Sequence, residues 1–150
     1  MKALHHAPTA ARILLGFVFT VFGANFFLHF LPTPPMEPGP AANFAMALFT
    51  SYVMVVVKVT EVSAGLLLLS NRFVPLALAL LAPVVVGIVG FHLTLAPASG
   101  VPAYLTFVLE LYLAYAYRSA FAPMLRARVA PTRDAFTVSE ASARHVASPV

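Results

Sequence analysis

Apolar residues occur in long runs that are separated by short polar or proline-rich stretches. Four such runs cover approximately residues 12–31, 41–70, 73–95 and 103–118. A helix needs about 20 predominantly apolar residues to cross roughly 30 Å of hydrocarbon. The pattern therefore predicts an all-α protein in which four transmembrane helices form an antiparallel bundle.

The stretches between the runs have the composition of loops and turns. Residues 32–40 read PTPPMEPGP, and proline lacks the amide donor that a continuing helix needs. The pair 71–72 reads as a tight polar turn, and residues 96–102 as a short uncharged loop. Residues 1–11 form a short polar lead. Residues 119–150 lose the apolar period and become rich in Ala, Ser and Arg, so we expect a mobile tail there.

The composition agrees with this prediction and also indicates an orientation. Hydrophobic residues make up 61% of the chain and charged residues 9%, whereas about a quarter of a soluble domain is charged. With four spans, the basic residues of the flanks all fall on one side: Lys2, Arg12, Arg72, Arg118, Arg126, Arg128, Arg133 and Arg144. The positive-inside rule then places both termini in the cytoplasm. The expected partner is the lipid bilayer, and not nucleic acid, because these residues form no patch with aromatics.

The chain contains no cysteine. This excludes structural disulfides, thiolate metal sites, thiol redox relays and cysteine nucleophiles. The sequence carries no cofactor fingerprint either, so it assigns no catalytic residue, and we do not expect the chain to perform redox chemistry alone.

Polar residues inside the predicted spans are the candidate functional residues. A charge at the centre of a spanning helix costs roughly 2.5–3.5 kcal/mol, so each needs a partner, water or a function. With about 1.5 Å of rise per residue from the cytoplasmic ends, these residues fall into two layers. Glu61 and Glu110 form an inner layer, and the outer layer contains Asn25, His29, Lys58 and His92.

The spacing of Lys58 and Glu61 places both side chains on one helix face. They are three residues apart, as neighbours on a helix surface are, but lysine before glutamate is the weaker order for a pair within one helix. We therefore expect one of them to reach a neighbouring helix. A clasp that only fixes helix register is the structural alternative to a functional site.

Small residues predict where helix backbones approach closely. Gly16 and Gly23 lie seven residues apart in the first run, and Gly87 and Gly90 three apart in the third. Gly65 continues the face of Lys58 and Glu61. Such glycines permit close packing between membrane helices.

The charges inside the spans do not balance. One lysine and two glutamates, with neutral histidines, leave a net charge of −1. Because an unpaired buried charge is costly, we expect an acid to bind a proton or a histidine to become charged. The candidate proton site comprises Asn25, His29, Lys58, Glu61, His92 and Glu110.

Several segments resemble the DoxX family of small bacterial membrane proteins. They are LLGFVFTVFGANFFLHFLP, KVTEVSAGLLLLSNRFVPLALALLAPVVVGIVGFHLTL and VLELYLAYAYRSAF, within about residues 10–122. The most specific pieces are Lys58-x-x-Glu61 followed by Gly65, and Phe91-His92. The resemblance implies a four-helix bundle in the bacterial inner membrane. In some members of the family it also implies a link to quinone-coupled oxidation or to oxidoreductase assemblies.

Three classes of function remain open at this point. In the first, His29 or His92 contacts a quinone while Lys58 and Glu61 supply charge and protons. In the second, the chain is a non-enzymatic subunit or anchor of a membrane or soluble oxidoreductase, or a homo-oligomer. The third class has weaker support and includes a small-solute carrier and a haem bundle with His29 and His92 as axial ligands. No metal site is expected, because Glu61 lies roughly 9 Å from His29 in depth.

Overall fold

The computed structural model describes residues 3–32 and 35–128, and within these ranges every regular element is helical. The elements are α1 (Ala3–Leu28), α2 (Pro40–Phe49), α3 (Tyr52–Leu69), α4 (Val74–Thr94), the 3-10 helix η1 (Pro97–Ser99), α5 (Val101–Ala116) and α6 (Arg118–Phe121). This confirms the predicted all-α class. Lys2, Arg133 and Arg144, for which the sequence predicts a cytoplasmic location, and most of the predicted tail lie outside the described residues.

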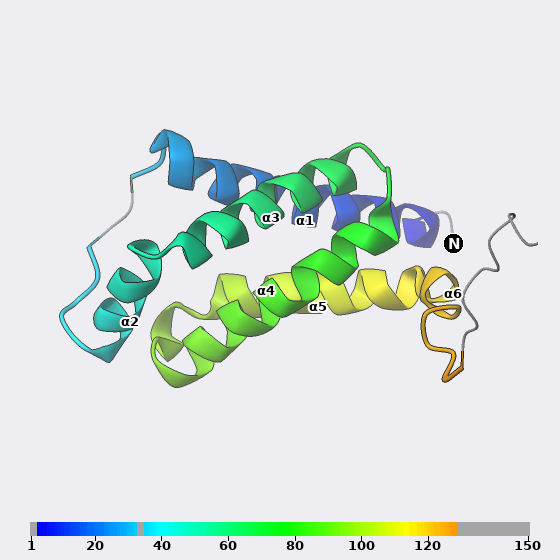
Figure 1. Cartoon of the computed structure of the whole chain (residues 1–150). Coiled ribbons are helices and arrows are strands. Elements are labelled where there is room, and N and C mark those ends of the chain that lie inside the picture. Colours follow the sequence, from blue (N-terminus) through cyan, green and yellow to red (C-terminus); the bar gives the residue numbers. More distant parts are fainter. Residues whose placement is uncertain (1–2, 33–34, 129–150) are drawn as a thin grey trace, which may run out of the picture.

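The long helices pack side by side around one apolar core (Figure 1). α1 packs along α3, α3 against α4, α4 against α5, and α5 returns to α1. Large residues from all four helices are fully buried between them: Leu15, Leu68, Leu78, Leu81, Val85 and Leu113. The core therefore joins residues that lie far apart along the chain.

Glycine allows the backbones of α1 and α3 to approach closely. A Cβ atom on Gly65 would lie 2.8 Å from the amide nitrogen of Thr20 and 2.9 Å from the carbonyl oxygen of Gly16. Likewise, a Cβ on Gly16 would lie 3.0 Å from the carbonyl oxygen of Gly65. Only glycine fits such contacts without a backbone shift, which confirms the close approach predicted at Gly16 and shows that its partner is Gly65 of α3.

Arg12 is buried at the same interface, whereas the sequence predicts only a flanking charge there. The residue lies within α1. This helix begins at Ala3 and not near residue 12 as predicted. The residue is 7% exposed, and its guanidinium donates hydrogen bonds to the carbonyl oxygens of Leu68 and Leu69. The last carbonyls of a helix lack amide partners and carry partial negative charge. Arg12 therefore stabilises the end of α3.

The single helix predicted over residues 41–70 is wrong, because the chain forms two helices there. The Thr50 hydroxyl donates to the carbonyl of Met46 at 2.9 Å, and the Ser51 hydroxyl donates to that of Leu48 at 2.7 Å. Ser51 has extended backbone angles and is the N-cap residue that precedes α3. Such local bonds compete with the helical pattern and end α2. Figure 1 shows α2 at one end of the bundle.

Among the described residues, three helices are long and apolar enough to cross a membrane. They are α3, α4 and the part of α1 from His6 to Leu28. The predicted fourth span, residues 103–118, is helical as α5 but comprises only 16 residues. Many large apolar side chains point outward, among them Leu28, Val86, Leu93 and Val108, each at least 60% exposed. An outward-facing apolar surface of this kind is typical of a membrane protein.

Candidate functional site

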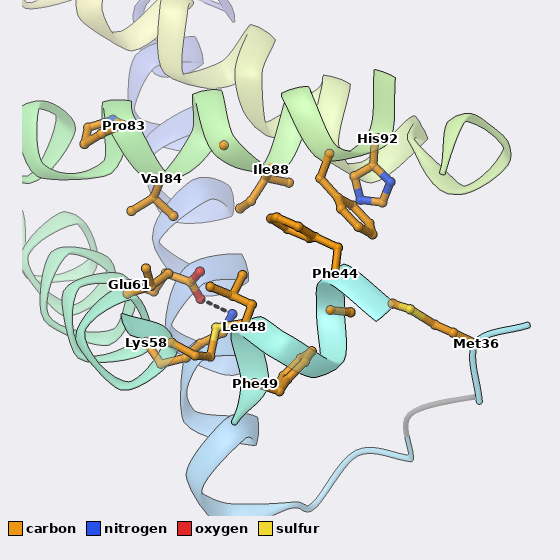
Figure 2. Close-up of a pocket in the computed structure, with 15 residues that line it drawn as sticks. Met36, Phe44, Leu48, Phe49, Lys58, Glu61, Pro83, Val84, Ile88 and His92 are labelled. Carbon is orange, nitrogen blue, oxygen red and sulfur yellow. Dashed lines mark hydrogen bonds and ion pairs between the residues drawn. The ribbon is translucent and has the colours of Figure 1, made fainter. Parts of the chain in front are cut away.

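A cavity of about 290 Å³ lies between α2, α3 and α4 (Figure 2). Its polar residues are Lys58 and Glu61 from α3 and His92 from α4. The remaining wall is apolar and includes the rings of Phe44 and Phe49 from α2. We call this space the first cavity. It joins three of the six residues that the sequence singled out.

Lys58 and Glu61 form an ion pair within α3. Lys58 Nζ lies 2.7 Å from Glu61 Oε2, and Glu61 is only 2% exposed. The expectation that one partner would reach another helix is therefore wrong. Placing lysine before glutamate weakens such a pair by at most about a few tenths of a kcal/mol in water. The cost of leaving a buried carboxylate unpaired is several times larger, so the pair closes locally.

His92 lies in the last turn of α4, at the other end of the first cavity. Figure 2 shows Val84 of α4 facing Glu61, with His92 farther along the same helix and Phe44 between the two polar ends. Val84 and His92 are eight residues apart, which corresponds to about 12 Å along the helix. The first cavity therefore offers polar groups at two separated ends of an apolar space.

Neighbouring groups fix the His92 ring. Its Nδ1 atom lies 3.3 Å from the carbonyl oxygen of Ala96 and 3.3 Å from the Ser99 hydroxyl. The ring also packs edge-on against Phe91, with 5.2 Å between centroids. Phe91 in turn stacks on Phe44 of α2 at 5.8 Å, which joins α2 to α4. Because Nδ1 is held by the η1 turn, Nε2 is the ring nitrogen available to a ligand.

Gly87 gives the first cavity part of its width. A Cβ atom added there would meet nothing within 4 Å, and the same holds for Gly90. The prediction that these two glycines mark a close approach of helices is therefore wrong. Gly87 lines the first cavity instead, where a larger side chain would occupy ligand space.

Asn25 and His29 do not line the first cavity, although the depth scale placed them beside Lys58 and His92. The Asn25 side chain accepts a hydrogen bond from the Leu31 amide at 2.6 Å and holds the chain as it leaves α1. His29 has a left-handed backbone with a φ of 51° and is exposed. Neither the quinone contact nor the haem pair predicted for His29 is assembled in this cavity.

Glu110 is buried in a different place from Glu61. It lines a second cavity of about 450 Å³ between α4 and α5, while the residue itself is 6% exposed. α4 separates the two cavities, because Val84 lines the first and Val85 the second. The predicted inner layer of Glu61 and Glu110 is therefore divided between two sites.

Within residues 3–32 and 35–128 no group of three or more His, Asp or Glu side chains is arranged to hold a metal ion. Comparison of the chain with protein-family models, curated proteins and solved structures found no match. The first cavity, with Lys58, Glu61 and His92, is thus the site that joins most of the candidate residues.

Proposed function

We propose that this chain is a four-span protein of the bacterial inner membrane, DoxX-like, and that it binds a quinone-type molecule in the first cavity. One observation carries the proposal: the Lys58–Glu61 pair and His92 line the same apolar, aromatic-walled space. The sequence predicts six candidate residues from their depth along the spans. Three of them, Lys58, Glu61 and His92, line one ligand-sized cavity.

The membrane setting has support from the helices. α1, α3 and α4 have spanning length and composition, and their outward faces are apolar. α5 is the fourth span of the proposal. Its 16 residues extend about 24 Å, and α6 follows after Tyr117. With α5 as a span, Arg72 between α3 and α4 and Arg118 after α5 both face the cytoplasm, as the positive-inside rule requires.

The size and lining of the first cavity suit a quinone head group. Its volume of about 290 Å³ is just below the roughly 300–1,000 Å³ that ligand pockets occupy. A flat ring packs well against Phe44 and Phe49, with its isoprenoid tail left on the apolar outer surface. Sites of this kind combine apolar walls with a few placed polar groups.

The polar groups match the two carbonyl oxygens of such a ring. In the tautomer that carries its proton on Nε2, the Ser99 hydroxyl turns from the Ala96 carbonyl oxygen to donate to His92 Nδ1, and Nε2–H donates to one carbonyl of the ring. Lys58 has three N–H donors and uses one on Glu61, so another can reach the second carbonyl. Reduction of a quinone to a quinol takes two electrons and two protons. In the proposal Glu61 and His92 relay the protons, and an oxidoreductase partner, either a membrane or a soluble subunit, supplies the electrons.

A binding titration with a short-chain ubiquinone tests the proposal on the full chain in mild detergent. We expect saturable binding that weakens about tenfold or more in His92→Ala, since a hydrogen bond to the ligand is lost. Gly87→Leu should abolish binding by filling the cavity, whereas Gly90→Leu, in open space outside the cavity, should not. Equal binding by all four proteins would refute the proposal.

A further inference from the structure

The second cavity is enclosed by α4 on one side and by α5, α6 and the turn after α6 on the other. Its volume of about 450 Å³ falls within the range of small-molecule sites. The wall consists of apolar side chains, apart from Glu110 and Arg118. Three wall residues, Val86, Leu111 and Leu125, are more than half exposed, so the cavity opens sideways at the apolar surface of the bundle.

Glu110 is one of the two charged residues that line this cavity, together with Arg118. The residue is 6% exposed, and neither carboxyl oxygen has a hydrogen-bond partner among the described residues. Both oxygens of a buried carboxyl group normally find donors. A carboxylate in an apolar site is also costly without an opposite charge beside it. The Glu110 side chain, buried at the wall of this cavity, therefore has two acceptor oxygens whose donors are missing from the part of the chain that the structure describes.

The cations near Glu110 are engaged elsewhere. The Arg118 guanidinium donates to the Tyr115 carbonyl oxygen at 3.0 Å and lies 4.5 Å from the centre of the Tyr115 ring. It belongs to α6 and lines the same cavity, but it makes no hydrogen bond to Glu110. Lys58 is paired with Glu61 and lines the first cavity, on the other side of α4. Glu110 therefore has no positively charged partner among the described residues, and a cationic ligand could provide one.

We infer that the second cavity binds an amphipathic ammonium ion, such as a protonated lipophilic amine. Its N–H groups donate to the Glu110 carboxylate, and its apolar body packs against Leu78, Val86 and Phe107. The ligand enters from the bilayer through the side opening. Charge-assisted hydrogen bonds to a carboxylate are about twice as strong as neutral ones, which selects an amine over a neutral molecule of the same shape. This second site is independent of the quinone proposal.

A pair of probes tests the inference without any substitution. Calorimetric titration of the full chain in mild detergent compares 4-phenylbutylamine with 4-phenylbutan-1-ol, which has the same apolar body and no charge. We expect saturable binding of the amine and at least about tenfold weaker binding of the alcohol. Equal binding of the two probes, or no saturable binding of the amine, would overturn the inference.

Substitutions then locate the site. Glu110→Gln keeps the shape of the side chain but not its charge, and should weaken amine binding about tenfold or more. Ala82→Phe fills the cavity from an exposed position on α4 and should block binding while Glu110 stays in place. Glu37→Gln, in an exposed loop, and Gly87→Leu, in the first cavity, should bind the amine as the unaltered chain does. If Glu110→Gln and Ala82→Phe both bind normally, the amine does not occupy this cavity and the inference is wrong.

Discussion

Lys58 and Glu61 form an ion pair of 2.7 Å within α3, and both side chains line the cavity that α3 shares with α2 and α4. The pair therefore neutralises a buried charge and also places an ammonium group at a ligand-sized space. If the pair were only a clasp between two helices, neither group would be available to a ligand.

Removal of one partner of this pair should cost more than removal of both. Lys58→Met leaves Glu61 buried without its counter-charge, and we expect the free energy of unfolding to fall by about 2–4 kcal/mol. The double variant Lys58→Met/Glu61→Gln should regain most of that loss. Thermal unfolding in detergent measures both. A double variant that is less stable than the single one would contradict this account.

The contact between α1 and α3 predicts a sharp difference between two glycines. Gly65→Ala should destabilise the chain by about 1–3 kcal/mol, because the new Cβ would lie within 3 Å of the backbone of Thr20 and Gly16. Gly90→Ala is the matched control, since its Cβ meets nothing and alanine favours a helix over glycine by roughly 1 kcal/mol. We expect the melting temperature to fall for the first variant and to hold or rise for the second. The reverse order would show that this interface is packed differently.

Arg12 should contribute to stability through the end of α3. Arg12→Met keeps much of the apolar stem but removes the guanidinium bonds to the carbonyls of Leu68 and Leu69, and Leu68 keeps only its bond from the Asn71 amide. Loss of hydrogen bonds to a charged group costs on the order of 1.5–3 kcal/mol. Arg126→Met, at an exposed position, should change the melting temperature little. Similar small effects for both substitutions would mean that Arg12 is only a flanking charge.

The α3 and α4 spans of the proposed topology can be tested with single cysteines, because the chain has none of its own. In intact cells, a thiol reagent that cannot cross the membrane should label Glu37→Cys and Ala98→Cys from outside. Ser70→Cys, beside the turn between α3 and α4, should react only after the membrane is opened. Labelling of Ala98→Cys and Ser70→Cys from the same side would rule out α4 as a span.

The apolar pattern predicted the helical class and one helix almost to its ends, since residues 73–95 became α4 from Val74 to Thr94. It missed the break at Thr50 and Ser51, because that break depends on side-chain hydrogen bonds within the segment and not on hydropathy. It also missed the structural role of Arg12, which depends on a helix end that is 56 residues away in the sequence.

The candidate site was predicted in part, for a geometrical reason. Depth along a helix axis placed His29 and His92 in one layer, but depth does not say which face of the helix a residue occupies or which neighbour it meets. His92 lines the first cavity, whereas His29 follows the end of α1 at an exposed position. The same limit applies to Glu61 and Glu110, which lie at cavities on different sides of α4.

Photolabelling with an azido-quinone, followed by mass spectrometry of the labelled peptides, tests the quinone site most directly. The account predicts adducts on α2, within Pro40–Phe49, and on the second half of α4 near Gly87 and His92, and it predicts that excess unlabelled quinone prevents them. Adducts confined to the end of α1 near His29, or to α5 near Glu110, would contradict it.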